Sequence, residues 1–373
     1  MRRTTFISIA LAIACHGIAP AQARLDDVHP ILKSAFDASG VTERESRALT
    51  SRFDALAQEA SDRFGAVRSP ERRARRLHKY LHDRVFLQYR DDADGVDDVL
   101  ARGDFNCVSS TLLEGLLASS LGLNPTIVSG SRHVFLRLEL PSRVVDVETT
   151  YREGFDARGN AAASARFLIA DRVASPDAIA VRGARERIEH GGDAPPVPLA
   201  SGAAFVWYNA AERALARGEG RVAAEHLLAG ETLYPGIATG DESLQSQLGR
   251  AFRLDYDAAR FDDAYVSASI GVRLGPSVVS ARDRLIAAAA QRIEALLELG
   301  DAGKAESILG ELGAMLGDGA NRFERHILPL VVAAAVRVGD WERALCLSDR
   351  FGAVELDAVE ARRLGDWVRS RHP

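Results

Sequence analysis

One cysteine, one histidine and two carboxylates lie in a single stretch of the sequence, between residues 103 and 155. Cys107 comes first, His133 follows, and Asp146 and Glu148 come last. A thiolate can attack a carbonyl carbon, and an imidazole can carry the proton. A carboxylate can orient the imidazole and stabilise its charged form. These residue types in this order indicate nucleophilic catalysis through a Cys-His-acid triad.

An apolar run directly after Cys107 predicts the element that positions the thiol. In residues 108–121 the leucines recur at three- and four-residue steps, which indicates a helix with one buried face. A thiol at the start of a helix feels unpaired N–H groups and the positive end of the helix dipole, and both favour the thiolate. The Asn124-Pro125 pair ends the predicted helix.

Two strand-like segments follow the helix, at residues 132–138 and 143–149. His133 stands at the start of the first segment. Asp146 and Glu148 stand on the second, two residues apart, so that on a strand both side chains leave the same face. Either carboxylate could therefore orient the histidine.

These three elements resemble the core of the transglutaminase-like cysteine peptidase superfamily. In that family an Asn-Cys pair starts a helix, a histidine starts a strand, and an Asp-x-Thr-like motif lies on the next strand. The resemblance covers about residues 77–155. Glu148-Thr149-Thr150 stands where the family usually has Asp-Pro-Thr, so Glu148 and Asp146 both remain candidates for the third member.

The resemblance implies an α+β fold with a papain-like core, in which a cysteine-bearing helix packs on an antiparallel sheet. It also implies an enzyme that acts on amide bonds, by hydrolysis of a peptide or isopeptide bond or by acyl transfer from a glutamine-like amide. Cys107 would attack the carbonyl, and His133 would shuttle the proton. A group upstream of the cysteine often completes the oxyanion site in this family, and the candidate donors are the Cys107 N–H and Gln88. The sequence has no paired Cys/His spacing of a zinc site, and we expect neither metal nor cofactor.

Each of these residues also has a purely structural interpretation. A free cysteine is commonly a small buried hydrophobe, and a histidine or acid on a strand can simply follow the burial pattern of the sheet. The alternative function is therefore a catalytically inactive binding or scaffold protein.

The first 23 residues have the features of a secretory signal. Two arginines precede an apolar stretch, residues 6–15, and Ala21-Gln22-Ala23 offers a cleavage site. The stretch is too short to span a bilayer stably. We expect export to the periplasm or secretion, with a lipid anchor at Cys15 as the alternative.

Composition excludes some classes of partner. The chain of 373 residues has a formal net charge of −5, and loss of the signal leaves 45 basic against 52 acidic residues. Nothing in this balance favours nucleic acid. No later segment is apolar for 18 residues, so we expect no transmembrane segment in the mature chain. Cys346 lies in an apolar helical pattern and is expected in a core.

Four alanines mark a repeat in the C-terminal half. They stand 41, 41 and 39 residues apart, in a region whose pattern is entirely helical. These positions resemble anchor positions of tetratricopeptide units, which implies an α-solenoid that binds a protein or peptide partner or substrate. The anchors are Ala223, Ala264, Ala305 and Ala344. The predicted domains are a signal (1–23), a transglutaminase-like domain (24–185), a linker (186–200) and a helical-repeat domain (201–373).

Overall fold

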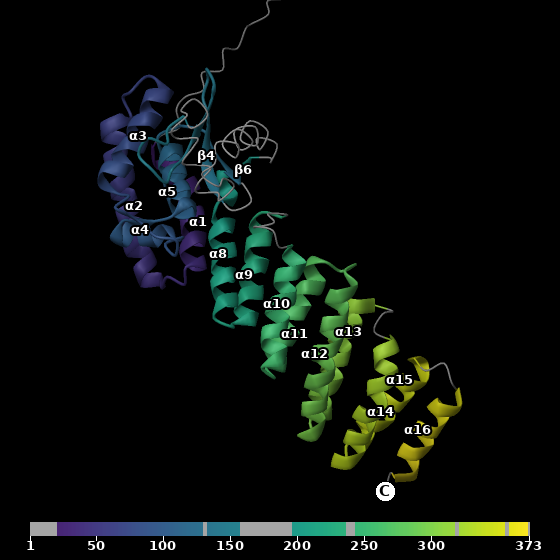
Figure 1. Ribbon diagram of the computed structural model, residues 1–373. Helices are drawn as coiled ribbons and strands as arrows, with labels where there is room; N and C mark the ends of the chain where they lie inside the picture. The colour runs from purple at the N-terminus through teal and green to yellow at the C-terminus, as the bar shows by residue number, and fades with distance from the viewer. Residues whose placement is uncertain are drawn as a thin grey trace, which may run out of the picture. The chain divides into compact units, whose positions relative to one another are not determined.

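The computed structural model describes residues 21–129, 133–156, 196–235, 243–317, 321–354 and 358–371 (Figure 1). In these residues the chain is mixed helix and sheet but mostly helical, with 14 helices and two small sheets. It divides into two compact units. The first takes residues 1–34, 42–128 and 134–200, and the second takes 35–41, 129–133 and 201–373, so the main division falls between Ala200 and Ser201.

Five helices precede the sheet of the first unit, and two of them begin at recognisable capping motifs. Thr42 and Glu45 form a capping box at one start. At another, Ser69 accepts the N–H of Arg72 and Pro70 is the first helical residue. The helices are α1 (Ala21–Ala38), α2 (Glu43–Phe64), α3 (Pro70–Arg84), α4 (Val96–Arg102) and α5 (Cys107–Ser120).

Helix α5 is the core of this unit, because every residue from Val108 to Ala118 is buried. The prediction of one buried face was wrong in this respect: small polar residues fill the positions between the leucines and let other elements approach from all sides. Gly115 shows how close the approach is. A Cβ atom there would lie 2.8 Å from Leu199 and 3.1 Å from Leu136.

The main sheet of the first unit has the strand order β5-β4-β3-β6. Strands β4 and β5 pair antiparallel, with Arg137 opposite Asp146. They fall within the two predicted segments except at Glu139, the last residue of β4, whereas the sequence did not predict β3. The strands are β3 (Pro125–Ser129), β4 (Val134–Glu139), β5 (Val144–Val147) and β6 (Val197–Pro198). A separate parallel pair is formed by β1 (Gln88–Tyr89) and β2 (Asp104–Phe105).

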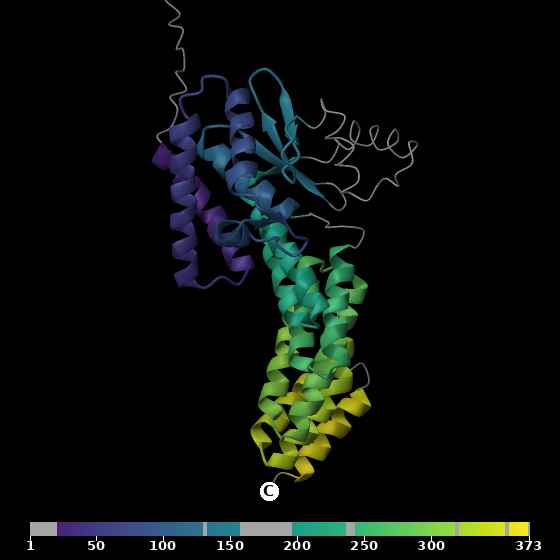
Figure 2. The ribbon, with the colours of Figure 1, turned by 60° about the vertical axis from the view of Figure 1, so that its left-hand side comes forward.

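The second unit contains nine helices among its described residues, which follow one another along the unit (Figures 1 and 2). The four anchor alanines are fully buried, and each is the fourth residue of its helix. The helices are α8 (Ala203–Ala216), α9 (Gly220–Leu233), α10 (Leu244–Asp257), α11 (Phe261–Leu274), α12 (Val279–Glu298), α13 (Ala302–Leu316), α14 (Asn321–Val338), α15 (Trp341–Val354) and α16 (Ala358–Arg371). The regular spacing of the alanines therefore reflects a repeated helix pair.

The turn inside each pair repeats as closely as the alanines do. Two residues before α9, α11, α13 and α15 the backbone takes a positive φ, between 56° and 79°. The next residue then donates its N–H to a carbonyl five residues back, as in Asp301 to Leu296 and Asp340 to Ala335. The residues with positive φ are Gly218, Ala259, Gly300 and Gly339.

Some predicted segments lie outside the described residues, and part of the predicted linker forms a strand. The predicted signal, apart from its last three residues, lies outside the described residues, and so do Cys15 and residues 186–195 of the predicted linker. Val197 and Pro198, at the end of that linker, form β6 and pair with β3. No helix in the described ranges is both long enough and apolar enough to cross a membrane.

Candidate functional site

Cys107 is the first residue of α5 and is partly exposed. The side chain of Asn106 accepts the N–H groups of Val108 and Ser109 at 2.8 and 3.2 Å. That cap leaves the N–H of Cys107 itself pointing out of the first turn, where it can donate to an external oxygen. The thiol thus stands at the positive end of a buried helix and next to an available backbone donor.

The loop before α4 fixes this helix start in place. Asn106 Nδ2 donates to the carbonyl of Asp91 at 3.2 Å, and Ser109 Oγ donates to the carbonyl of Ala93 at 2.6 Å. Asn106 and Ser109 are themselves buried. The position of Cys107 is therefore set by hydrogen bonds on both sides of the cap, and not by helix packing alone.

Tyr89 brings a hydroxyl to the same place. It pairs with Phe105 in the parallel ladder of β1 and β2, and the two rings meet edge to face at 5.8 Å. Although half of the Tyr89 surface is exposed, desolvation of its hydroxyl raises its pKa to about 12. The charges of Cys107, Asp91 and Glu148 and a hydrogen bond from the hydroxyl to Asp91 add to this rise. Tyr89 is therefore a neutral hydrogen-bond donor at neutral pH, within electrostatic reach of both Cys107 and Glu148.

His133 is buried and lies directly before β4; by its contacts it is grouped with residues 129–133 in the second unit. The next residue, Val134, is attached to α5, because its carbonyl accepts a hydrogen bond from Thr111 Oγ1 at 3.4 Å. Thr111 is one helical turn from Cys107. The start of β4 therefore lies beside the first turns of the cysteine-bearing helix.

Glu148 is fully buried just after β5, and its carboxylate is oriented by the chain that follows. Its Oε1 accepts the backbone N–H of Thr150 at 3.0 Å and the Thr150 hydroxyl at 2.5 Å. The neighbouring Thr149 is anchored to α5 by hydroxyl contacts of 2.8 Å with Ser110 and Thr111. The turn after β5 thus holds the carboxylate near the first turns of α5.

Asp146 has a different environment. Both of its carboxylate oxygens accept hydrogen bonds from Arg137, its cross-strand neighbour, at 2.7 and 3.2 Å. Both side chains are buried. A bidentate pair of this kind holds two charges in a fixed geometry inside the sheet.

Glu114 in the middle of α5 and the histidines of α3 form a buried polar cluster. Glu114 and His78 are both buried, and His78 Nδ1 lies 3.1 Å from Glu114 Oε2. Burial opposes the charged imidazole of His78, but Glu114 outweighs it and the pKa of His78 is raised. His82, whose ring centroid is 4.8 Å from that of His78, has its pKa lowered to about 3 by burial and by the neighbouring His78.

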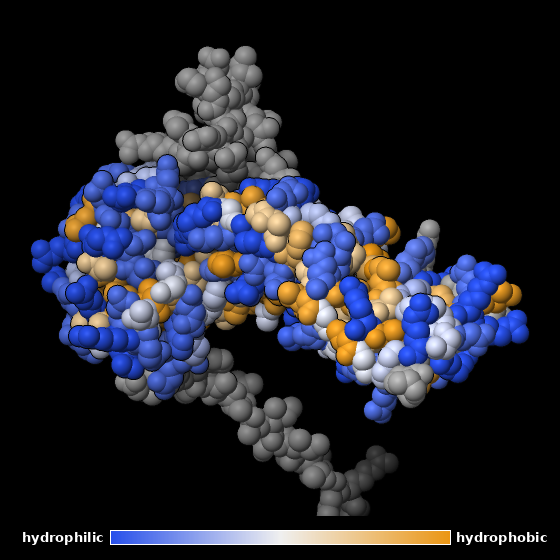
Figure 3. Space-filling model, turned by 90° about the horizontal axis from the view of Figure 1, so that it is seen from below, coloured by the Kyte–Doolittle hydropathy of each residue, from blue (hydrophilic) through white to orange (hydrophobic). Residues whose placement is uncertain are grey.

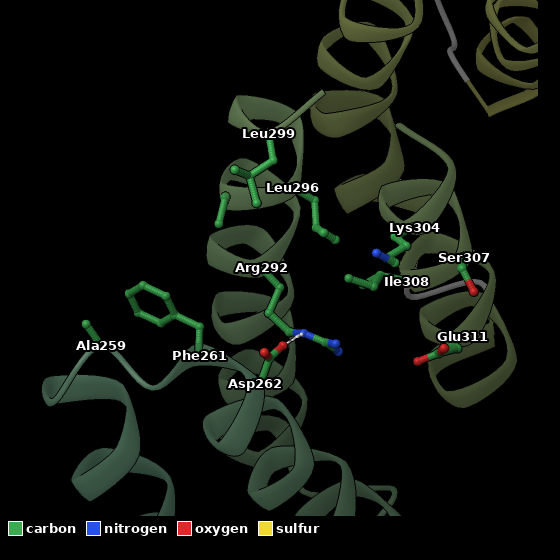
Figure 4. Close-up of a pocket in the computed structure, with 11 residues that line it drawn as sticks. Ala259, Phe261, Asp262, Arg292, Leu296, Leu299, Lys304, Ser307, Ile308 and Glu311 are labelled. Carbon is green, nitrogen blue, oxygen red and sulfur yellow. Dashed lines mark hydrogen bonds and ion pairs between the residues drawn. The ribbon is translucent and has the colours of Figure 1, made fainter. Parts of the chain in front are cut away.

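The second unit offers a pocket of about 550 Å³, lined by the turn before α11 and by α11, α12 and α13 (Figure 4). Glu311 is fixed by the buried hydroxyl of Tyr265, which donates to its Oε2 at 2.9 Å. Arg292 is fixed by Asp262 at 2.5 Å and lies over the Tyr265 ring at 4.6 Å. Figure 4 shows Arg292, Lys304 and Glu311 directed into the space between the helices.

Apolar side chains add to the surface of this unit. Orange patches interrupt the blue surface over the repeat helices in Figure 3. Leu299, on the rim of the pocket, is 83 % exposed, and Leu330 is 56 % exposed. The described helices thus present a surface on which polar and apolar side chains are mixed, as in many binding sites.

The second free cysteine was wrongly expected in a core. Cys346 is exposed on α15. The buried residues of this helix are Ala344, Leu347, Ser348 and Phe351, at three- and four-residue steps, and Cys346 lies on the other face.

Reasoning from the sequence missed Tyr89 and the neighbours of Glu148. The strand that carries Tyr89 is only Gln88–Tyr89, and two residues are too few for a strand pattern to be recognised in the sequence. Gln88, the donor considered from its position, is exposed and pairs with Asp104. In the described residues no group of three or more His, Cys, Asp or Glu side chains could hold a metal ion.

Comparisons with models of protein families, with curated proteins and with solved structures find no match to this chain.

Proposed function

We propose that the chain is a thiol-dependent enzyme of the transglutaminase-like kind, which acts on amide bonds by hydrolysis or acyl transfer. Cys107 is the nucleophile, His133 carries the proton, and Glu148 orients the imidazole. The substrate is a protein or peptide of the exported compartment.

The observation that carries this proposal is the environment of Cys107. The thiol opens a buried helix, its own N–H is not taken up by the Asn106 cap, and the Tyr89 hydroxyl lies within electrostatic reach of the thiol. A structural cysteine needs none of these groups, whereas a nucleophile needs a stabilised thiolate and donors for the developing oxyanion. The Cys107 N–H is one donor, and the Tyr89 hydroxyl is the second once it exchanges its hydrogen bond to Asp91 for the substrate oxygen.

Glu148 is a better orienting acid than Asp146 because of what each already binds. Arg137 takes both oxygens of Asp146. Glu148 Oε1 instead accepts two hydrogen bonds from Thr150, in the turn that follows β5. A triad acid must be held in place while it accepts the imidazole N–H, and these bonds hold Glu148 in place.

The protein carries its own control for a test of Cys107. Labelling with iodoacetamide at about pH 7, followed by mass spectrometry of the two cysteine peptides, compares Cys107 with the exposed Cys346 in one sample. We expect Cys107 to be labelled at least about tenfold faster, although it is the less exposed thiol. Equal rates, or faster labelling of Cys346, would remove the basis for the proposal.

A binding function is the second candidate, and the pocket between α11, α12 and α13 favours it. Its fixed carboxylate and guanidinium, with Leu296, Leu299 and Ile308 beside them, fit a peptide that carries both an apolar and charged side chains. If Cys107 is inert, the helical unit is then the functional part of the chain.

A further inference from the structure

Two arginines of the second unit converge, and in the described part of the chain neither forms an ion pair with a carboxylate. Arg253 is on α10 and Arg284 is on α12, helices that pack together in Figure 1. A Cβ atom on the buried Gly249 would lie 3.1 Å from Arg284 Nη1 and 3.6 Å from Arg253 Nη1. Both guanidinium groups therefore border the same point.

Two glycines and a glutamine surround the guanidinium group of Arg284. Arg284 Nη2 is 3.4 Å from Gln245 Oε1, and Gln245 Nε2 donates to the carbonyl of Gly271 at 3.2 Å. A Cβ atom on Gly271 would lie 4.0 Å from Arg284 Nη2. Arg284 thus lies over two glycines and is held in place by an amide, not by a carboxylate.

The pair lacks a direct carboxylate contact among the described residues, and Asp283 is the acidic group whose charge acts on Arg284. Within the described ranges neither Arg253 nor Arg284 forms an ion pair. Other partly exposed arginines of the unit do: Arg260 binds Asp255, Arg292 binds Asp262 and Arg350 binds Glu324. Desolvation and the charge of Arg253 lower the pKa of Arg284 and outweigh the opposing effect of the Asp283 charge, so placing the two guanidinium groups together costs free energy.

We propose that Arg253 and Arg284 form a binding site for an oxyanion, the carboxylate or phosphate group of a ligand. A guanidinium presents parallel N–H donors that match two oxygens of such a group. Two guanidinium groups bordering one point supply donors from two sides, and the bound anion removes their mutual repulsion. The site is separate from the cysteine and from the pocket lined by Arg292, and it does not depend on the proposed enzymatic function.

The test uses the full chain and two probes, inorganic phosphate and succinate, titrated at constant ionic strength by isothermal calorimetry. We expect saturable binding of at least one probe, with a Kd on the order of 1 mM. Arg253→Gln changes an exposed residue and should leave the fold intact while weakening binding about tenfold. Arg284→Gln should have the same effect.

Arg337→Gln is the matched control, because Arg337 is an exposed arginine of the same unit and lies on another helix, α14. It should leave the Kd unchanged. The probe that binds more tightly identifies the source of the anion. Absence of saturable binding of both probes, or a Kd unaffected by Arg253→Gln, would overturn the proposal.

Discussion

At the scale of single residues, the two candidate acids differ in what they already do. Asp146 neutralises a buried arginine, whereas Glu148 is held by a short turn beside the cysteine-bearing helix. The sequence could not separate them, because both follow the same alternation on one strand. Only the cross-strand register, which places Arg137 opposite Asp146, distinguishes their environments.

Substitution of the two acids should therefore give opposite phenotypes. Glu148→Gln should slow the labelling of Cys107 about tenfold and change stability little, since the glutamine keeps the size and one acceptor oxygen. Asp146→Asn should lower the free energy of unfolding by about 3 kcal/mol, because it leaves a buried arginine without its counter-charge. Iodoacetamide labelling and urea denaturation separate the two effects. If Asp146→Asn slows labelling more than Glu148→Gln in folded protein, the roles are reversed.

The lowered pKa of His82 makes the stability of the protein depend on pH. Its pKa is about 3 in the folded chain against an ordinary 6.5, so between these values the unfolded chain binds a proton that the folded chain does not. Stability is therefore present above about pH 6.5 and falls as the pH falls, by about 1.4 kcal/mol per unit. The raised pKa of His78 acts in the other direction and above pH 6.5, where its contribution is lost as the pH rises.

His82→Phe should remove this acid sensitivity. The substitution keeps a ring against Phe86, whose centroid is 5.2 Å away, and deletes the titrating group. Denaturation with urea between about pH 5 and 6.5 should give a flatter profile for the variant than for the wild type. Parallel profiles would show that His82 is not the residue responsible.

At the scale of elements, helix starts were the most predictable features. The helix that carries Cys107 starts at the predicted position with Asn106 as its cap, and Thr42 and Ser69 cap two other helices, because a cap depends on a few adjacent residues. Strand β3 and the pair β1–β2 were not predicted, since two to five residues give no reliable period. The all-round burial of α5 was missed for a related reason: Ser110 and Thr111 look like surface residues until Thr149 is placed against them.

The repeated turn of the second unit makes Ala259 an exception that can be tested. Gly218, Gly300 and Gly339 take the same left-handed conformation without cost, whereas an alanine at φ 56° is strained. Ala259→Gly should raise the free energy of unfolding by up to about 1 kcal/mol. The reverse change, Gly339→Ala, meets no atom within 4 Å and should lower it by about 1 kcal/mol through backbone strain alone. Thermal unfolding of both variants decides the matter; equal Tm values would mean that the turn relaxes.

At the scale of the whole molecule, the chain has two units. The last strand of the first unit comes after residues 157–195, which lie outside the described part of the chain. Strand β6 pairs with β3 and ends only at Pro198. A boundary drawn from sequence composition at residue 185 could not include it, because a two-residue strand within a proline-rich segment reads as a linker.

Two truncated chains test this boundary. Residues 24–200 keep β6, and we expect them to retain the fast labelling of Cys107. Residues 24–190 lack β6 and the contact of Leu199 with Gly115, so they should unfold more readily. Circular dichroism during heating compares the two; identical Tm values would show that β6 is dispensable.

The central claim, that Cys107 is an assembled nucleophile, is tested most directly by the pH dependence of its alkylation in the full chain. We expect the labelling rate of Cys107 to hold as the pH falls from about 8 to about 6, because an imidazolium keeps the thiolate present. The rate at Cys346, an exposed thiol with no part in the proposed mechanism, should fall over the same range. His133→Ala should make the Cys107 profile follow that of Cys346. Coincident profiles for the two cysteines in the wild-type protein would contradict the account.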